Sequence, residues 1–178
     1  MNISLGIKKI SPVYTDIQLA QKGDKGAFER LIEEHKYMLY RVAKSRLKFE
    51  EDIEDAFQET LIKAYNGMGN LRKEEYFKTW LVRIMINECN MIYRKRKKVD
   101  YLEECSEESM QMQETCSSVE IFDIINSLEE DLRTVTLLYF YEDMLQKDIA
   151  KLLNIPHGTV RSRISRAKEK LRDILIDC

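Results

Sequence analysis

The sequence predicts an all-α protein with two small helical domains joined by an acidic linker. Its 178 residues include six glycines and two prolines, and 34% of them are charged, as is typical of helical chains. Residues 83–98 carry six basic residues against one glutamate, whereas residues 99–120 carry seven acids and neither lysine nor arginine. An acidic segment without an apolar stripe is typical of a linker between domains.

The predicted division follows from this change in composition. A tail is expected at residues 1–14, a helical domain at 15–98, the linker at 99–120 and a second helical domain at 121–178. The net charge of −2 does not argue against nucleic acid as a partner, because a phosphate backbone responds to the local charge and not to the average.

The first domain is expected to begin with a short helix followed by a long one. Thr15 and Gln18 have the spacing of a capping box, which opens a helix that ends near Gly23. Asp24 is expected to cap the long helix, whose apolar stripe consists of Phe28, Leu31, Ile32, Leu39 and Val42. His35 falls within that stripe and is interpreted as structural, since no second catalytic group accompanies it.

The next helix, at residues 52–65, is predicted to have one packed face and one acidic face. Its apolar residues are Ile53, Phe57, Leu61 and Ala64, and its acidic face carries Asp52, Asp55, Gln58 and Glu59. Carboxylates at this spacing can act as acid and base or hold a metal. Without histidines or a glycine-rich phosphate loop, a solvated face or a docking surface for a basic partner is favoured.

A polar ridge is predicted on the helix that follows. Most positions from Trp80 to Tyr93 are apolar, and the polar exceptions include a narrow stripe that continues to residue 97: Arg83, Asn87, Asn90, Arg94 and Lys97. Asparagine offers a donor and an acceptor to a base edge, while arginine and lysine contact phosphates. Asparagines that satisfy buried backbone, with a solvated basic run after them, are the competing interpretation.

The loop before this helix and the tryptophan within it also carry predictions. The loop contains Asn66, Gly67, Gly69 and Asn70, and it is a candidate for accepting an unstacked base. Trp80 is expected to be a core anchor that shares its packed side with Ile84 and Met91.

The second domain is expected to end in a helix-turn-helix at residues 146–175. A short helical pattern stops at Asn154 and Pro156, and a longer one starts at Gly158 with Val160, Ile164, Ala167, Leu171 and Leu175 as its apolar stripe. Ala150 is small where the two helices cross, and Asn154 tolerates the left-handed conformation of the turn. A supporting helix is predicted to open with a capping box of Ser127 and Glu130 and to end near Glu142.

The second helix of this motif is predicted to enter a major groove. The residues expected to contact DNA are Thr159, Arg161, Ser162, Ser165, Arg166 and Lys168. Arg163 lies beside the apolar stripe, so an ion pair with Asp148 is expected there at least as readily as a DNA contact. A merely solvated amphipathic helix is the competing interpretation, and the preceding turn makes it less favoured.

No catalytic group, cofactor, metal site or small-molecule substrate is predicted. The four cysteines show no CxxC spacing and no nearby histidine pairs, so neither a zinc site nor a disulfide framework is expected. The N-terminal stretch contains Lys8 and Lys9 without a sustained apolar run, and no run of eighteen apolar residues occurs. The protein is therefore expected to be cytoplasmic.

Four motifs in this order resemble the sigma-70 family of bacterial transcription initiation factors, and most closely its small extracytoplasmic-function (ECF) group. They are GDKGAF at 23–28, DIEDAFQE at 52–59, WLVRIMIN at 80–87 and DIAKLLNIPHGTVRSRISRAKEKL at 148–171. The resemblance covers nearly the whole chain beyond residue 15. The chain departs from the family pattern at Glu129, where proline is usual, at Asn90, where aspartate is frequent, and at Asp148, where glutamate is.

The resemblance implies a role for each predicted surface. The acidic face with Asp52, Asp55, Gln58 and Glu59 would bind the clamp helices of core RNA polymerase. The polar ridge and the loop at residues 66–71 would recognise the minus-ten promoter element and help to melt it to single strands. The second domain would read the double-stranded minus-thirty-five element. A membrane-anchored anti-sigma factor, and a role in an envelope or stress response, are expected by analogy alone.

Two other classes of function remain open from the residues alone. A helix-turn-helix regulator that binds an operator without polymerase would shift operator DNA by itself. A DNA-acting enzyme that uses Asp52, Asp55 and Glu59 with a metal would show cleavage dependent on magnesium or manganese.

Overall fold

The computed structural model describes residues 15–100 and 121–176, and all regular secondary structure in these two stretches is helical. The predicted all-α class is confirmed. The first domain contains α1 (Asp16–Gln21), α2 (Lys25–Lys44), α3 (Glu50–Gly67), the short turns η1 (Met68–Asn70) and η2 (Glu74–Tyr76), and α4 (Phe77–Asp100). The second contains α5 (Ile121–Asn126), α6 (Glu130–Thr136), η3 (Leu137–Tyr141), α7 (Gln146–Leu153) and α8 (His157–Ile176).

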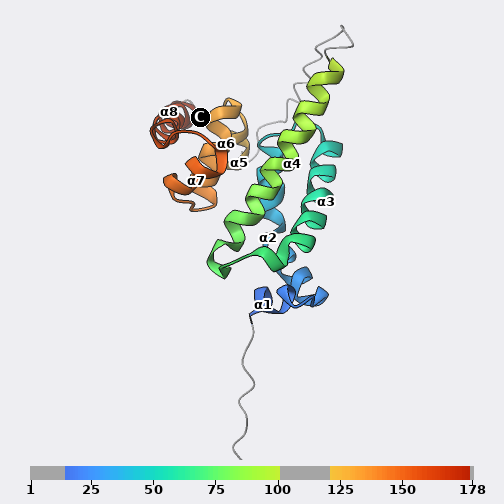
Figure 1. The fold of residues 1–178 in the computed structure, drawn as a ribbon. Helices are drawn as coiled ribbons and strands as arrows, with labels where there is room; N and C mark the ends of the chain where they lie inside the picture. Colours follow the sequence, from blue (N-terminus) through green and yellow to red (C-terminus); the bar gives the residue numbers. More distant parts are fainter. Residues whose placement is uncertain (1–14, 101–120, 177–178) are drawn as a thin grey trace, which may run out of the picture.

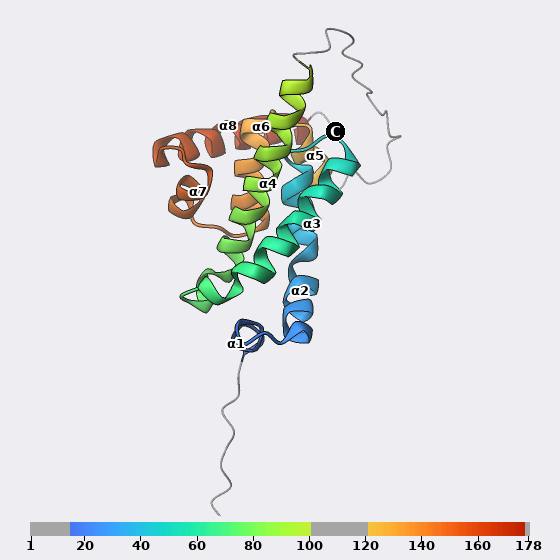
Figure 2. The same ribbon diagram turned by 45° about the vertical axis from the view of Figure 1, so that its right-hand side comes forward.

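Helices α2, α3 and α4 pack against one another, and α1 lies at the end of this bundle near the connection from α3 to α4 (Figure 1). The second domain lies against α4 on the side opposite α3, as two views of the ribbon show (Figure 2). Among the described residues, no helix combines the length and the apolar character that a membrane span requires.

The start of the first domain forms as the sequence predicts. The side chain of Thr15 accepts a hydrogen bond from the backbone N–H of Gln18, whose own side chain reaches back to the backbone of Thr15. Gly23 has a φ of 91°, which is a conformation that glycine adopts at little cost. Asp24 then caps α2 by accepting from the N–H of Ala27 at 2.9 Å.

The core of the first domain is built from α2, α3 and α4. Leu39, Leu81 and Met85 are among its fully buried side chains. His35 donates a hydrogen bond from Nδ1 to the carbonyl oxygen of Leu31 at 2.8 Å, and its ring packs edge-on against Phe77. These local contacts give His35 a structural role in the bundle.

The prediction that Trp80 packs against the core is confirmed, whereas the prediction that Met91 shares its packed side is wrong. Trp80 is half-buried and packs so closely on Gly67 that a Cβ added there would lie 3.1 Å from the Trp80 ring. Met91, which was expected on the same packed side, is 42% exposed. The reason is that the bundle covers α4 less completely toward its C-terminal end, where Tyr93 is exposed as well.

The boundaries of the predicted linker shift slightly. Helix α4 continues to Asp100, which is two residues into the segment predicted as linker at 99–120. The remainder of that segment, and the predicted tail at 1–14, lie outside the described residues.

The predicted capping box of the second domain is wrong. The hydroxyl of Ser127 donates to the carbonyl oxygen of Ile124 at 2.7 Å, at the end of α5, and α6 starts only at Glu130 with Glu129 in the cap position. Ser127 therefore closes one helix instead of opening the next. The chain after α6 does end its helical path near Glu142 as predicted, although Leu137–Tyr141 forms π-helical turns.

The helix-turn-helix forms as predicted. Asn154 ends α7 in the left-handed conformation, with φ of 53° and ψ of 46°. Ala150 is buried where α7 and α8 meet, and Val160, Ile164 and Ala167 line the buried side of α8. Because the turn is held by Asn154 and by buried aliphatic side chains on both helices, the outer face of α8 is presented in a fixed orientation.

The two domains share one apolar core. Val135, Leu138 and Ile149 of the second domain belong to the same buried cluster as Leu39 and Leu81 of the first. At its edge the carboxylate of Glu142 accepts from Arg41 at 2.6 Å and lies 3.1 Å from the Lys78 ammonium. The side chain of Glu142 is only 4% exposed, whereas those of Arg41 and Lys78 are 28% and 41% exposed, so a buried carboxylate meets two partly exposed cations at the contact between the domains.

Candidate nucleic-acid and partner surfaces

The outer face of α8 is basic and hollowed. Most residues predicted to contact DNA here are exposed, and four of them form a shallow hollow together with Gly158: Arg161, Ser162, Ser165 and Arg166. Lys168 is also exposed, and its ammonium lies 5.6 Å from the centre of the Phe140 ring. Thr159 is half-buried, and its carbonyl oxygen accepts from the Ser162 hydroxyl at 3.0 Å. Short side chains at the centre and cations around them suit close approach to a groove.

Two other cations of α8 are tied to the protein itself. Arg163 forms an ion pair as expected, but the predicted partner Asp148 is wrong, because Arg163 pairs with Asp131 of α6 at 2.5 Å. Lys170 pairs with Glu129 at 2.6 Å, and this hydrogen bond lowers the pKa of the Glu129 carboxyl. Both pairs join α8 to the start of α6, so these cations contribute to the domain and not to its outer basic face.

The polar ridge of α4 is exposed at four of its five predicted positions. Arg83, Asn87, Arg94 and Lys97 are exposed. Asn90 is half-buried, and its side-chain oxygen accepts from Arg46 at 2.7 Å. The same guanidinium lies 3.4 Å from the Thr134 hydroxyl of the second domain. Asn90 is thus occupied by a contact that helps to join the domains.

The loop before α4 combines buried apolar side chains with exposed polar ones. Met68 is 2% exposed and Leu71 is 8% exposed, whereas Asn70 is exposed to solvent. The placement of Asn66 in the loop is wrong, because α3 continues to Gly67 and Asn66 is an exposed residue of its last turn. Sequence reasoning missed the cations that follow, Arg72 and Lys73, and the exposed ring of Tyr76. The Lys73 ammonium lies 5.5 Å from the centre of that ring.

The acidic face of α3 consists of Asp55, Gln58 and Glu59, all exposed. The expectation that Asp52 belongs to it is wrong, because Asp52 is 8% exposed and accepts from Arg96 of α4 at 2.8 Å. Arg96 also stacks on the Phe49 ring at 4.2 Å. Asp52 therefore lies on the side of α3 that faces α4, where its charge is paired.

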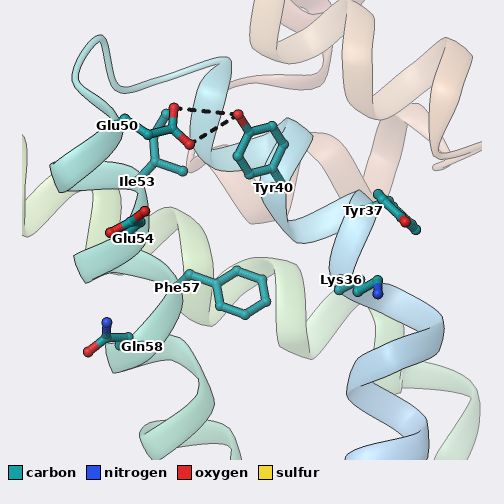
Figure 3. A pocket seen from close by; sticks show the side chains of 8 residues that line it. All are labelled: Lys36, Tyr37, Tyr40, Glu50, Ile53, Glu54, Phe57 and Gln58. Atoms are coloured by element: carbon teal, nitrogen blue, oxygen red, sulfur yellow. Dashed lines mark hydrogen bonds between the residues drawn. The ribbon is translucent and has the colours of Figure 1, made fainter.

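An open groove between α2 and α3 adjoins this face (Figure 3). It has a volume of about 530 Å³. The side chains that line it include Tyr37, Tyr40, Ile53, Phe57 and Gln58. Tyr37 is 67% exposed. Burial, followed by the hydrogen bond to Glu50, raises the pKa of Tyr40. Tyr37 and Tyr40 lie three positions apart on α2, and this spacing was the signal in the sequence that could have identified the groove.

Neither the carboxylates nor the cysteine of the first domain form a reactive site. No group of three or more histidines, cysteines, aspartates and glutamates able to hold a metal occurs in residues 15–100 and 121–176. Asp52 is paired with Arg96, so it does not join Asp55 and Glu59 in an open cluster. Cys89 is buried, and burial raises the pKa of its thiol to about 12, which keeps it protonated and unreactive.

Comparison with known proteins gives consistent matches along the chain. Residues 31–99 match the family model of sigma-70 region 2, and residues 118–171 match that of sigma-70 region 4. The RNA polymerase sigma-H factor of Pseudomonas aeruginosa is 33% identical, over 87% of this chain and 89% of that protein. The ECF RNA polymerase sigma-E factor of Haemophilus influenzae is also 33% identical, over 88% of this chain and 92% of its own.

Two solved structures share the fold. The sigma factor RpoE of Bartonella quintana, crystallised with the anti-sigma factor NepR, has a TM-score of 0.66 and 24% identity over 83% of this chain and 96% of that chain. CnrH, solved with the cytosolic domain of CnrY, has a TM-score of 0.63 and 24% identity over 91% of this chain and 96% of that chain.

Proposed function

Because the chain belongs to the sigma-70 family, in its extracytoplasmic-function group, it is a promoter-directing subunit of RNA polymerase and not an enzyme, and we propose which of its surfaces make the contacts. An operator-binding regulator that works without polymerase is not favoured, since the relatives named as sigma factors match nearly the whole chain.

The polymerase surface is assigned to the acidic face of α3 and the groove beside it. Asp55, Gln58 and Glu59 are exposed on one helix, and Gln58 also lines the groove that contains Tyr37 and Phe57. This continuity between an acidic face and an apolar groove is the observation that carries the assignment. It suits a basic amphipathic partner, because charge guides encounter and apolar burial supplies affinity. Asp52 supports this surface only indirectly, by pairing with Arg96.

The minus-ten surface is assigned to the ridge of α4 together with the loop before it. Asn87 offers a donor and an acceptor between the exposed cations Arg83 and Arg94, with Lys97 one turn further on, which suits a nucleic-acid strand whose bases and phosphates are both contacted. Asn66, on the last turn of α3, and Asn70, in η1, are assigned to contact an extruded base, because both are exposed beside this ridge. Asn90 can offer this surface only its amide N–H groups while its side-chain oxygen accepts from Arg46.

The minus-thirty-five surface is assigned to the outer face of α8. Arg161, Ser162, Ser165 and Arg166 surround the hollow, with Thr159 and Lys168 at its margins. Arginine beside small polar residues is the combination that reads base edges in a major groove.

The regulatory setting is assigned by analogy. Both solved relatives were determined together with a protein partner, and that of RpoE is named as an anti-sigma factor. This chain is expected to work in the cytoplasm and to be held by a membrane-anchored anti-sigma factor until an envelope or other stress releases it.

Charge reversal on α3 tests the polymerase assignment. Asp55→Lys places a cation on the acidic face, so the dissociation constant for core polymerase should rise at least tenfold. This change corresponds to a loss of about 1.4 kcal/mol of binding free energy. Glu29→Lys is the matched control, because Glu29 is exposed on α2 and does not line the groove. The measurement is the dissociation constant of each variant for purified core polymerase. Equal affinities for the two variants would contradict the assignment.

A further inference from the structure

Helix α1 is joined to the loop between α3 and α4 by three side chains of one face. The Thr15 hydroxyl donates to Oε2 of Glu74 at 2.8 Å, and the Gln18 amide donates to Oε1 of the same carboxylate at 2.6 Å. The Gln21 amide donates to the carbonyl oxygen of Leu71 at 2.7 Å and lies 3.5 Å from that of Met68. Positions 15, 18 and 21 recur at helical spacing, so all three point toward the loop.

These hydrogen bonds hold the loop at both of its turns. Met68 and Leu71 flank the exposed pair Gly69 and Asn70, so Gln21 fixes the backbone on either side of Asn70. Glu74 begins η2 (Glu74–Tyr76), which leads into α4. The backbone carbonyl oxygens of this loop and the carboxylate of Glu74 already accept hydrogen bonds before any ligand is present. Such a loop loses little further conformational entropy when it binds a ligand.

Helix α1 is itself fixed to the bundle on its other side. Asp16 accepts two hydrogen bonds from Arg30 of α2, at 2.6 and 3.0 Å, and Ala20 is buried. This pairing lowers the pKa of Asp16. The short helix therefore connects α2 to the loop through side-chain hydrogen bonds, in addition to the burial of Met68 and Leu71 in the core.

We propose that Thr15, Gln18 and Gln21 are positioning residues for base recognition, holding Asn70 where an extruded base of the promoter strand is read. The inference rests on the proposed function, since it takes the loop as part of the minus-ten surface. The ligand class is a single unstacked nucleobase with its phosphates, which the exposed cations Arg72 and Lys73 neutralise.

The test compares two isosteric glutamine substitutions. Gln21→Met removes the amide donor and keeps the side-chain length, and Gln58→Met makes the same change on the polymerase surface. Open-complex formation is measured with core polymerase on a promoter that the unaltered chain transcribes, and on versions with one minus-ten base changed. The readout is the ratio of the rates on matched and changed promoters, because a fraction of unfolded protein lowers both rates equally.

Gln21→Met should lower this ratio about fivefold, the equivalent of one net hydrogen bond, with polymerase affinity unchanged. Gln58→Met should leave the ratio intact and weaken polymerase binding. Thr15→Val and Thr15→Ser form a second pair, in which only the serine keeps the donor to Glu74 and so the ratio. An unchanged ratio in both Gln21→Met and Thr15→Val would overturn the inference.

Asn70→Ala separates this failure from failure of the proposed function. If Asn70→Ala lowers the ratio while Gln21→Met does not, the loop reads a base without help from α1, and the positioning role is refuted. If neither variant lowers it, the loop does not read the minus-ten element, and the assignment of that surface is overturned together with the inference.

Discussion

At the scale of single residues, the arginines of α8 differ in what their guanidinium groups contact. The Arg163 side chain is 18% exposed and pairs with Asp131, whereas Arg161 and Arg166 are exposed at the hollow. A cation that is already paired within the fold has its charge neutralised and its N–H donors occupied, so it binds a phosphate or a base weakly. We therefore expect neighbouring arginines of the same helix to have separate roles in stability and in DNA binding.

Alanine substitutions should separate these roles. Arg161→Ala and Arg166→Ala should each weaken binding to minus-thirty-five DNA by about 1 to 3 kcal/mol where a bidentate base contact is lost. Arg163→Ala should lower the free energy of unfolding by about 1 kcal/mol, as expected for a pair with one exposed partner, and leave DNA affinity nearly unchanged. Urea denaturation and DNA titration at fixed salt measure the two effects. Normal stability of Arg163→Ala with reduced DNA affinity would contradict the assignment.

The residue scale is also where the sequence was least informative. Wheel positions gave the exposed faces of α3, α4 and α8, but they could not give the partner of a charge on another helix. On the helical wheel Asp52 lies at the edge of the predicted acidic face. The ion pair with Arg96 of α4, which the wheel cannot show, accompanies its burial. Asn90 differs from Asn87 for the same reason, because Arg46 comes from α2.

At the scale of elements, local signals predicted helices well where the cap lies within the chain segment itself. The box of Thr15 and Gln18, the cap at Asp24 and the left-handed Asn154 are all present. The box of Ser127 and Glu130 failed because α5 ends at Asn126, so that Ser127 bonds backward. The short α5 was missed, since six residues at the boundary of an acidic segment show too little periodicity.

The turn between α7 and α8 offers a test at this scale. Asn154 has a φ of 53°, a conformation that costs other L-residues about 1 to 2 kcal/mol. Asn154→Ala should therefore lower the free energy of unfolding by about 1 kcal/mol, while Asn154→Gly should retain it. Equilibrium denaturation of the three proteins measures the difference. Equal stability of the alanine variant and the parent would show that this backbone conformation is not required.

At the scale of the whole molecule, the division into two domains coexists with close packing between them. The change in composition after residue 98 predicted two units, and nothing in the sequence indicated that they share a core. The contact depends on Glu142, which meets Arg41 of α2 and Lys78 of α4. The Lys78 ammonium also donates to the Glu142 carbonyl oxygen at 2.8 Å. These charges lie more than sixty positions apart, so no local pattern reports them.

Removal of this carboxylate should loosen the packing of the domains. Glu142→Ala loses charge-assisted hydrogen bonds from two cations and should lower the free energy of unfolding by about 2 kcal/mol. The radius of gyration should rise in small-angle scattering, since Arg41 and Lys78 lose their shared counter-charge and the contact between the domains then rests mainly on the apolar core. Glu129→Ala is the matched control, because its pair with Lys170 lies within the second domain and both partners are exposed. An unchanged radius in Glu142→Ala would contradict this role.

This chain directs polymerase to promoters, and we propose that its surface for docking is separate from its surface for melting. Permanganate reactivity of thymines near the start site tests it directly, with core polymerase, promoter DNA and each variant. Unstacking a base costs a few kcal/mol, so the free chain should not open DNA, and the complete complex should. Asn87→Ala should bind polymerase normally and give no reactive thymines, whereas Asp55→Lys should give none because it fails to bind. Reactive thymines without the chain, or undiminished reactivity with both variants, would contradict the account.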